Sequence, residues 1–281
     1  MHILMALTVI LAVVAGVAWT RHSVRSFETM VQGDVTALAH VAETRPPATQ
    51  SARSLPEPAA RYLSRALPCG PHSRGLVSME QEGFFRLKPD QGWLPMVAHA
   101  WWTVHQPGLV WHGRIELSKI AWATGRDKLI AGEAGMIIRM WSAYTVARMS
   151  GPEVAQSDLM RWLTEAVWFP AALAPGGCIR WEEHGPDSAV AVVESGTLAG
   201  RAVFFFDEHG NPLRAECERL REEGGRQVPR PFTAMYGPMR ERDGILAPKT
   251  GEAIWDLPEG RFAYARIRAG HTTYGAGKPA P

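Results

Sequence analysis

The sequence predicts an α+β protein made mostly of antiparallel strands: a strongly curved sheet or incomplete barrel with a packed helix, plus an N-terminal transmembrane helix. Three observations predict this class. The chain begins with a long run that carries no charge. From Gly75 onward, hydrophobic residues recur with a period of two, which is typical of half-buried strands. A single apolar stripe with helical spacing interrupts the strands near residue 160.

Composition narrows the possible functions. The 281 residues include 46% hydrophobic and 21% charged residues, which suits one large domain plus an anchor. The formal net charge of +2, without a long lysine or arginine run, argues against nucleic-acid binding. Cys69, Cys178 and Cys217 form no C-x-x-C pair, so a cysteine-based zinc motif is excluded and at least one thiol is unpaired.

Residues 1–20 are expected to form a transmembrane anchor. Ile3 to Trp19 contains no charged residue, and a helix rising ~1.5 Å per residue over this length nearly spans a hydrocarbon core of ~30 Å. A cleaved signal peptide is the alternative, although the usual basic segment before the apolar run is missing. Arg21 and Arg25 follow the run and favour a cytoplasmic domain by the positive-inside rule.

The segments after the anchor divide into three parts. Residues 21–54 contain a juxtamembrane helix, Phe27 to Glu43, whose apolar residues have helical spacing, and then a proline-rich linker. Residues 55–274 are the β-rich domain, opened by a short amphipathic helix from Ala59 to Leu67. Residues 275–281 are expected to be a flexible tail.

A hairpin near residue 105 is the best defined of the predicted strand pairs. The loop His105 to Gly108 joins two alternating runs, with Val104 placed opposite Leu109. A slip of one residue would mix the polar and apolar faces, so the alternation selects this register. One face is then entirely apolar and contains Met96, Ala98, Ala100, Trp102, Trp111, Gly113 and Ile115. His99 and His112 lie on the other face, but no third ligand with defined spacing accompanies them, and no metal site is predicted.

Ten further segments have strand character, and turn sequences separate many of them. So many short, evenly spaced strands favour a curved or partly closed antiparallel sheet over a parallel sheet with crossovers. The segments are Ile120 to Ala123, Lys128 to Ala131, Met136 to Met149 in one or two pieces, Cys178 to Glu183, Ala189 to Glu194, Arg201 to Asp207, Leu213 to Leu220, Thr233 to Tyr236, Glu252 to Trp255 and Arg261 to Ile267.

The interrupting helix is predicted over Asp158 to Phe169, with Ser157 as its N-cap and Pro170 ending it. Its apolar stripe faces one side, and Arg161, Glu165 and Trp168 fall together on the opposite side. Two interpretations remain open. Arg161 and Glu165 could form an exposed i, i+4 pair. Alternatively, the helix is buried on both sides in the mouth of the curved sheet, where Glu165 needs a partner such as Arg161.

Five motifs resemble those of an uncharacterised family of bacterial membrane-anchored, β-rich proteins. They are Q-x-G-x-F-R at Gln81, W-x-P at Trp93, P-G-L-V-W at Pro107, L-x-E-x-V-W-F-P at Leu163 and W-x-x-P-x-G-R-F-x-Y at Trp255. The resemblance runs from about Leu55 to Tyr274. It implies a domain of unassigned activity tethered by a single pass in a bacterial inner membrane, and it supplies no catalytic residues.

The predicted architecture is also similar to the half-barrels with a helical plug found in lipoprotein carriers. That likeness implies a periplasmic domain, whereas the arginines after the anchor favour the cytoplasm. The sequence therefore leaves the side of the membrane open.

The best functional prediction is binding or carrying a lipid or another apolar ligand between the sheet and the helix. The small residues of the apolar face leave room there for a ligand or for the helix itself. The expected ligand-binding residues are Trp102, Trp111, Ala98, Ala100, Gly113, Trp162, Glu165 and Trp168.

Two other functions remain as alternatives. The first is a non-enzymatic envelope scaffold or protein-interaction module, in which the tryptophans fill a dry core. The second is a hydrolase that uses Glu165 or a histidine. The sequence contains no G-x-S-x-G elbow, Walker loop or dinucleotide fingerprint, so it favours a protein that is not an enzyme and that needs no cofactor or metal.

Overall fold

The computed structural model describes residues 2–43, 55–68, 70, 75–175 and 177–275. The helices are α1 (His2–Glu43), α2 (Glu57–Ala66) and α3 (Pro152–Glu165), and the 3-10 helices are η1 (Ala166–Trp168) and η2 (Pro170–Leu173). The strands are β1 (Leu76–Phe85), β2 (Leu94–Thr103), β3 (Leu109–Glu116), β4 (Trp122–Ile130), β5 (Glu133–Met140), β6 (Tyr144–Ser150), β7 (Ile179–Gly185), β8 (Ser188–Ser195), β9 (Leu198–Phe206), β10 (Pro212–Glu223), β11 (Arg226–Tyr236), β12 (Met239–Arg242), β13 (Ile245–Pro248), β14 (Thr250–Leu257) and β15 (Gly260–Tyr274).

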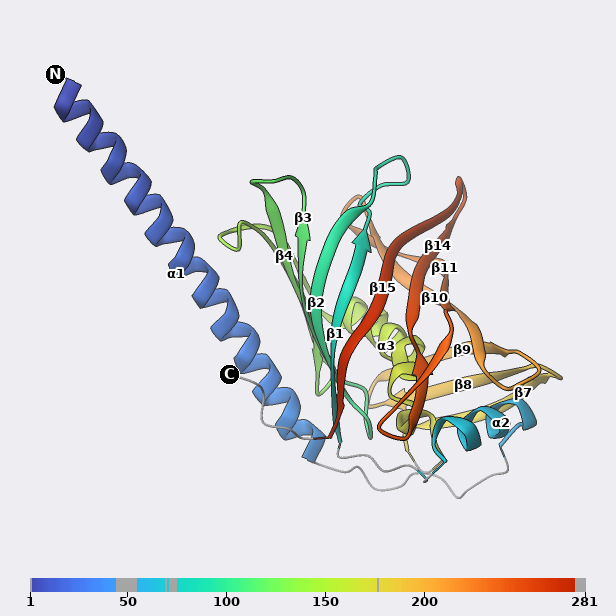
Figure 1. Cartoon of the computed structure of the whole chain (residues 1–281). Coiled ribbons are helices and arrows are strands. Elements are labelled where there is room, and N and C mark those ends of the chain that lie inside the picture. Colours follow the sequence, from blue (N-terminus) through green and yellow to red (C-terminus); the bar gives the residue numbers. More distant parts are fainter. Residues whose placement is uncertain (1, 44–54, 69, 71–74, 176, 276–281) are drawn as a thin grey trace.

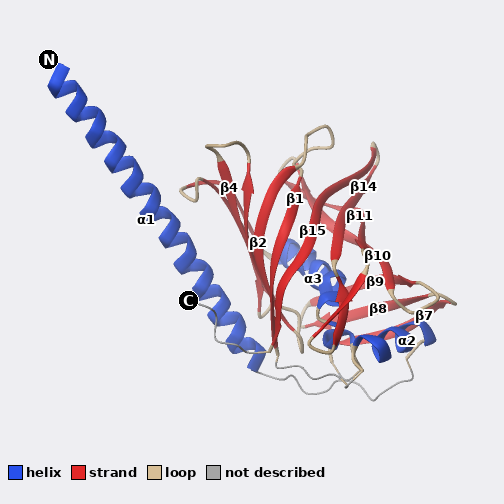
Figure 2. Cartoon of the chain, viewed as in Figure 1, coloured by secondary structure: helices blue, strands red, loops and turns tan. Residues whose placement is uncertain are grey.

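One large antiparallel sheet contains thirteen strands in the order β6-β5-β4-β3-β2-β1-β15-β14-β11-β10-β9-β8-β7. The pairing of β1 with β15 joins an N-terminal meander to a C-terminal half. The chain passes from β6 at one edge to β7 at the other through α3, so α3 has to cross the sheet. Figures 1 and 2 show α3 inside the curve of the sheet and α1 on its outer side.

The sheet curves around a core formed by its inner face and the helix. Register shifts in the β1–β15 and β14–β15 pairs bend the central strands. Trp102 from β2, Trp162 from α3 and Phe204 from β9 are fully buried in this core. The predicted class, a curved antiparallel half-barrel with a packed helix, is confirmed.

Helix α1 runs without a break from His2 to Glu43, so the predicted boundary between residues 20 and 21 falls inside one helix. Its C-terminal part docks on the outer face of the sheet. Phe27, Val31, Val35 and Leu38 form a buried stripe against Trp101, Val110 and Ile137. Among them Asp34 is paired with Arg126 at 3.2 Å and Lys128 at 2.9 Å on β4.

In the part of the chain that the structure describes, no helix has both the length and the apolarity needed to cross a membrane. The predicted transmembrane anchor is therefore not supported by these residues. The predicted linker at residues 44–54 and most of the predicted tail lie outside the described residues, so the predicted domain boundaries there stay predictions.

The predicted hairpin keeps its faces but has a different register. Trp102 pairs with Leu109 and Ala100 with Trp111, a shift of two residues from the prediction. The reason is that β2 ends at Thr103, where the Thr103 amide bonds the Gly108 carbonyl at 3.0 Å. The Val104 amide instead bonds the Gly75 carbonyl at 2.8 Å. Because a shift of two preserves the alternation, the inner face is still the apolar one.

The predicted boundaries of one strand and of the helix are also wrong. The separate strand segments predicted around residues 120 and 128 are one strand, β4, which begins at Trp122. The predicted helix begins six residues early, at Pro152 rather than Asp158, and the α-helix ends at Glu165 rather than Phe169. The predicted N-cap Ser157 therefore lies inside α3, and Gly151 is the N-cap. Proline is favoured in the first helical turn because its missing N–H has no partner there, which suits the start at Pro152.

Candidate functional site

Two places on the domain are candidate functional sites. One is the interface between α3 and the inner face of the sheet, where charged side chains are buried. The other is a groove on the outer face, where apolar side chains are exposed. The first contains every predicted site residue. The second contains none of them.

Three indole N–H bonds link α3 and its continuation to neighbouring strands, and a fourth joins two strands of the sheet. Trp102 donates to the Glu165 carboxylate at 2.7 Å, and Trp111 donates to the Gln81 amide oxygen at 3.0 Å. Trp162 donates to the Thr103 carbonyl at 2.9 Å, and Trp168 to the Pro248 carbonyl at 3.1 Å. A buried indole normally finds an acceptor. The bonds of Trp102, Trp162 and Trp168 also fix the position of α3 and its continuation, whereas the bond of Trp111 joins β3 to β1.

The polar side of α3 is buried against the sheet. Arg161 donates from Nε to Glu165 at 2.8 Å and from Nη1 to Asp127 on β4 at 2.8 Å. The same guanidinium lies 5.4 Å from the centre of the Trp111 ring. The second interpretation of the helix is therefore confirmed: both sides of α3 are buried, and Glu165 has Arg161 and Trp102 as partners.

Asp158 and Arg219 extend this arrangement into a charged cluster, which we define as Asp127, Asp158, Arg161, Glu165 and Arg219. Burial, with a further contribution from Asp127, raises the pKa of Asp158 to about 8. Burial also raises the pKa of Asp127, against the opposing effect of Arg161. Among the described residues, Asp158 Oδ2 and Arg219 Nε have no hydrogen-bond partner. The cluster can hold a proton near neutral pH.

The predicted ligand-binding residues do lie together at this interface. Trp102, Trp162, Ala100 and Trp168 are buried, and Trp102 stacks on Phe169 with 5.2 Å between ring centroids. The space above Gly113 is filled by Trp111, because a Cβ added to Gly113 would come within 2.2 Å of that ring.

Gly113 therefore makes room for a tryptophan of the protein itself. Ligand binding by these eight residues stays a prediction, and it would require α3 to move away from the sheet.

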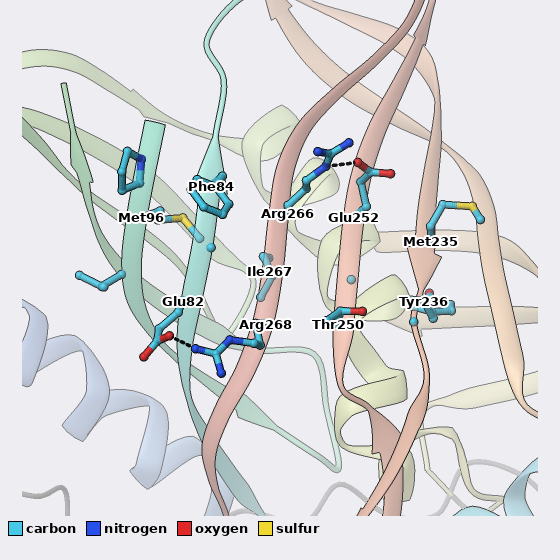
Figure 3. A pocket seen from close by; sticks show the side chains of 15 residues that line it. Glu82, Phe84, Met96, Met235, Tyr236, Thr250, Glu252, Arg266, Ile267 and Arg268 are labelled. Atoms are coloured by element: carbon cyan, nitrogen blue, oxygen red, sulfur yellow. Dashed lines mark hydrogen bonds and ion pairs between the residues drawn. The ribbon is translucent and has the colours of Figure 1, made fainter. Parts of the chain in front are cut away.

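The outer groove is an open site with a volume of about 750 Å³. It crosses β2, β1, β15, β14 and β11 on the outer side of the sheet, in front of α3 (Figure 3). Phe84, Pro95, Val97 and Met235 line it from the outer face. Met96 and Ile267 also border it, although their strand positions belong to the inner face. Phe84 is 48% exposed and Val97 is 55% exposed, beside the charged residues Glu82, Arg266 and Arg268.

Two ion pairs lie within the groove (Figure 3). Glu82 is paired with Arg268, and Arg266 donates to Glu252 at 2.6 Å. Arg266 also lies 4.3 Å from the centre of the Trp93 ring. This volume is in the range of small-molecule sites, and an apolar lining with a few polar groups is typical of them.

Sequence reasoning missed the groove because it assigned all binding to the inner face. A signal was present: Phe84 interrupts the polar set of Glu80, Glu82 and Arg86 on its strand, and Val97 stands between two residues of the apolar face.

Two histidines lie next to each other on the outer face. His99 faces His112 across the β2–β3 pair and stacks on Trp101 with 4.0 Å between ring centroids. Burial lowers the pKa of both imidazoles. Within the described ranges, no three histidine, cysteine, aspartate or glutamate residues are placed to hold a metal ion.

Three solved structures have a similar arrangement. A putative outer membrane lipoprotein-sorting protein domain from Vibrio parahaemolyticus is 11% identical, covers 79% of this chain and 92% of its own, and has a TM-score of 0.42. A LolA superfamily protein from Nitrosomonas europaea is 10% identical, with coverage of 79% and 93% and a TM-score of 0.44. A DUF1329 family protein from Desulfovibrio piger is 11% identical, with coverage of 80% and 95% and a TM-score of 0.40.

At these identities the three structures assign no activity to this chain. No curated protein matches the sequence. The profile of one family matches residues 45–267, which is most of the predicted domain and includes all the helices and strands from α2 to β14. The chain belongs to the Family of unknown function (DUF6544).

Proposed function

We propose that this protein binds an apolar or amphipathic small molecule, such as a lipid acyl chain, in the outer groove. The observation that supports this most directly is the exposure of Phe84 and Val97 in a groove of about 750 Å³. Exposed aromatic and branched side chains on a solvated sheet face leave apolar area in water, which an apolar ligand would cover.

The ion pairs indicate how a polar head group would be held. Arg266 and Arg268 each have one carboxylate partner, Glu252 and Glu82, and all four lie in the groove. An uncharged or zwitterionic head group could use both signs without displacing either pair. A purely anionic ligand would have to compete with a carboxylate for its arginine.

We also propose that the N-terminal part of α1 attaches the protein to a membrane. Its exposed side chains are almost all apolar and include Met5, Leu7, Ile10, Leu11, Val14 and Val17. The predicted bacterial inner membrane is the proposed location, and the side on which the domain lies stays open.

Native mass spectrometry of the full chain, followed by organic extraction, tests ligand binding without a guess about identity. Two neighbouring residues separate the two possible locations, because Val97 points into the groove and Ala98 toward α3. Val97→Asp should abolish the bound mass, whereas Ala98→Leu should leave it unchanged. Leu213→Asp, at another exposed position outside the groove, serves as the matched control.

The outcomes are distinct. Loss of the ligand with Ala98→Leu alone would overturn the groove and restore the predicted site under α3. A chain that carries no additional mass, and that takes none up from a membrane extract, would remove the binding proposal.

That last result would favour the second candidate, a scaffold or interaction module. The observation on its side is the filled interface at α3, where Trp111 and Trp162 occupy the inner face of the sheet. Crosslinking in membranes would then identify the partner.

A further inference from the structure

One edge of the sheet carries a group of exposed aromatic and aliphatic side chains, which we call the aromatic tip: Trp19, Ile120, Trp141 and Tyr144. They come from α1, the β3–β4 turn and the β5–β6 hairpin. Their exposed fractions are 45%, 84%, 40% and 57%, respectively. Residues far apart in the sequence thus meet on one apolar surface.

The members of the aromatic tip are in contact with one another. Trp19 meets Tyr144 edge to face, with 4.9 Å between ring centroids, and Tyr144 lies 6.5 Å from Trp141. Trp141 donates its indole N–H to the Ile120 carbonyl at 3.0 Å. These contacts hold the two turns together beside α1, so the surface is continuous.

The backbone at Trp141 is strained. Trp141 and the following Ser142 have φ values of 53° and 60°, in the left-handed region that favours glycine and is exceptional for a bulky side chain. The Ala143 amide closes the turn on the Met140 carbonyl at 2.9 Å, and Ser142 bonds Thr124 at 2.7 Å. The turn is thereby fixed with a tryptophan where glycine or asparagine would be less strained.

The surroundings of the aromatic tip fit a bilayer interface. Trp19 stands at the end of the exposed apolar part of α1, and Arg21 and Arg25 follow it as exposed cations. Lys119 is exposed next to Ile120. Tryptophan and tyrosine prefer the boundary between hydrocarbon and water, and basic side chains there attract anionic head groups.

We infer that the aromatic tip rests in the headgroup region of a lipid bilayer, so that the sheet edge formed by β5 and β6 faces the membrane. The inference rests on the proposed attachment of α1 and adds a second, separate contact. A helix alone would leave the domain free to tilt, whereas two contacts fix which edge approaches the lipid.

Nitroxide quenching tests this in the full chain reconstituted into vesicles of phosphatidylcholine and phosphatidylglycerol. A fluorescent thiol label at Ile120→Cys reports the aromatic tip, one at Leu11→Cys reports α1, and one at Leu213→Cys is the distant control. The background carries Cys69→Ser, Cys178→Ala and Cys217→Ala, although burial already raises the pKa of Cys178 and Cys217 to about 12.

Headgroup-level nitroxide lipids are expected to quench the Ile120→Cys label and to leave the Leu213→Cys label bright. Adding Trp141→Asn, which suits the left-handed turn and removes the indole, should lower the quenching at position 120 while quenching at position 11 persists. Quenching at position 11 without quenching at position 120 would overturn the inference and keep the attachment of α1.

Quenching at neither position would overturn both the inference and the attachment, and a protein partner or a second copy would then be sought for this surface. Neither result bears on the ligand groove, because mass spectrometry tests that site separately.

Discussion

Trp102 on β2 donates its indole N–H to Glu165 at the last turn of α3, with 2.7 Å between the two atoms. The Glu165 carboxylate, on the polar side of the helix, thus accepts a hydrogen bond from the buried Trp102 of the sheet. Together with Arg161, it connects α3 to β2 and, through Asp127, to β4. This connection explains why a carboxylate and an arginine are retained on a helix that is buried on both sides.

Glu165→Gln should destabilise the fold without abolishing it. The amide oxygen can still accept the Trp102 bond, but Arg161 loses one of its two carboxylates in a buried site. We expect a loss of about 2 kcal/mol in the free energy of unfolding. Chemical denaturation measures it. Glu165→Ala should cost more because it also leaves the indole N–H unpaired, and equal losses for the two variants would show that the Trp102 bond contributes nothing.

Asp158 should make stability depend on pH in an unusual direction. Its pKa in the folded protein is about 8, against about 4 in an unfolded chain, so between these values the native state holds a proton that the unfolded state does not. The free energy of unfolding contributed by this group therefore falls as pH rises from about 4 to about 8.

Asp158→Asn removes that dependence. The variant should match the wild type near pH 4 and exceed its stability by about 1 to 3 kcal/mol at pH 8. Denaturation curves across this range, with the exposed Asp90→Asn as control, give the measurement. A variant that is less stable than the wild type at pH 8 would contradict a buried, protonated Asp158.

Asp34 should control the docking of α1. It is 12% exposed and pairs with Arg126, which is 6% exposed, so Asp34→Asn leaves a buried guanidinium without its charged partner. We expect a cost of about 3 kcal/mol and faster hydrogen exchange from residue 27 to residue 43. Glu82→Gln, which breaks an exposed pair with Arg268, should cost less than about 1 kcal/mol. Unchanged exchange in α1 would show that its apolar stripe is sufficient for docking.

Gly113→Ala should destabilise the protein by overpacking. The new methyl group would meet the Trp111 ring at 2.2 Å, and the ring is held by its bond to Gln81. A cost of about 1 to 3 kcal/mol is expected. Gly135→Ala on β5 is the matched control, since its nearest contact is an ordinary 3.6 Å. Equal melting temperatures for the two variants would indicate that Trp111 can move aside, which would also make a ligand site there more accessible.

Much of the local structure could be predicted from the sequence, because it follows from periodicity. Alternation along Met96 to Trp102 assigns one face to the core whatever the partner strand, and this survived a register error of two residues. The helical spacing of Val31, Val35 and Leu38 likewise predicted a helix, which the structure has as part of α1. The residues that these side chains contact could not be predicted, because periodicity contains no information about distant segments.

The candidate site at α3 was less predictable, because it is formed by contacts between distant segments. The sequence determined that Arg161 and Glu165 share one side of a helix, that Trp102 and Gly113 share one face of a sheet, and that the chain opens with an apolar run. Only the tertiary structure decided that α3 joins the two edges of the sheet and so crosses its inner face.

The tertiary structure alone also decided that Trp111 fills the space above Gly113, that open volume lies at Phe84 and Val97 on the outer side, and that Trp19 meets Tyr144. These are contacts between residues far apart in the sequence or on different strands. They depend on how side-chain volumes and long-range pairings fit together, and local spacing does not specify either.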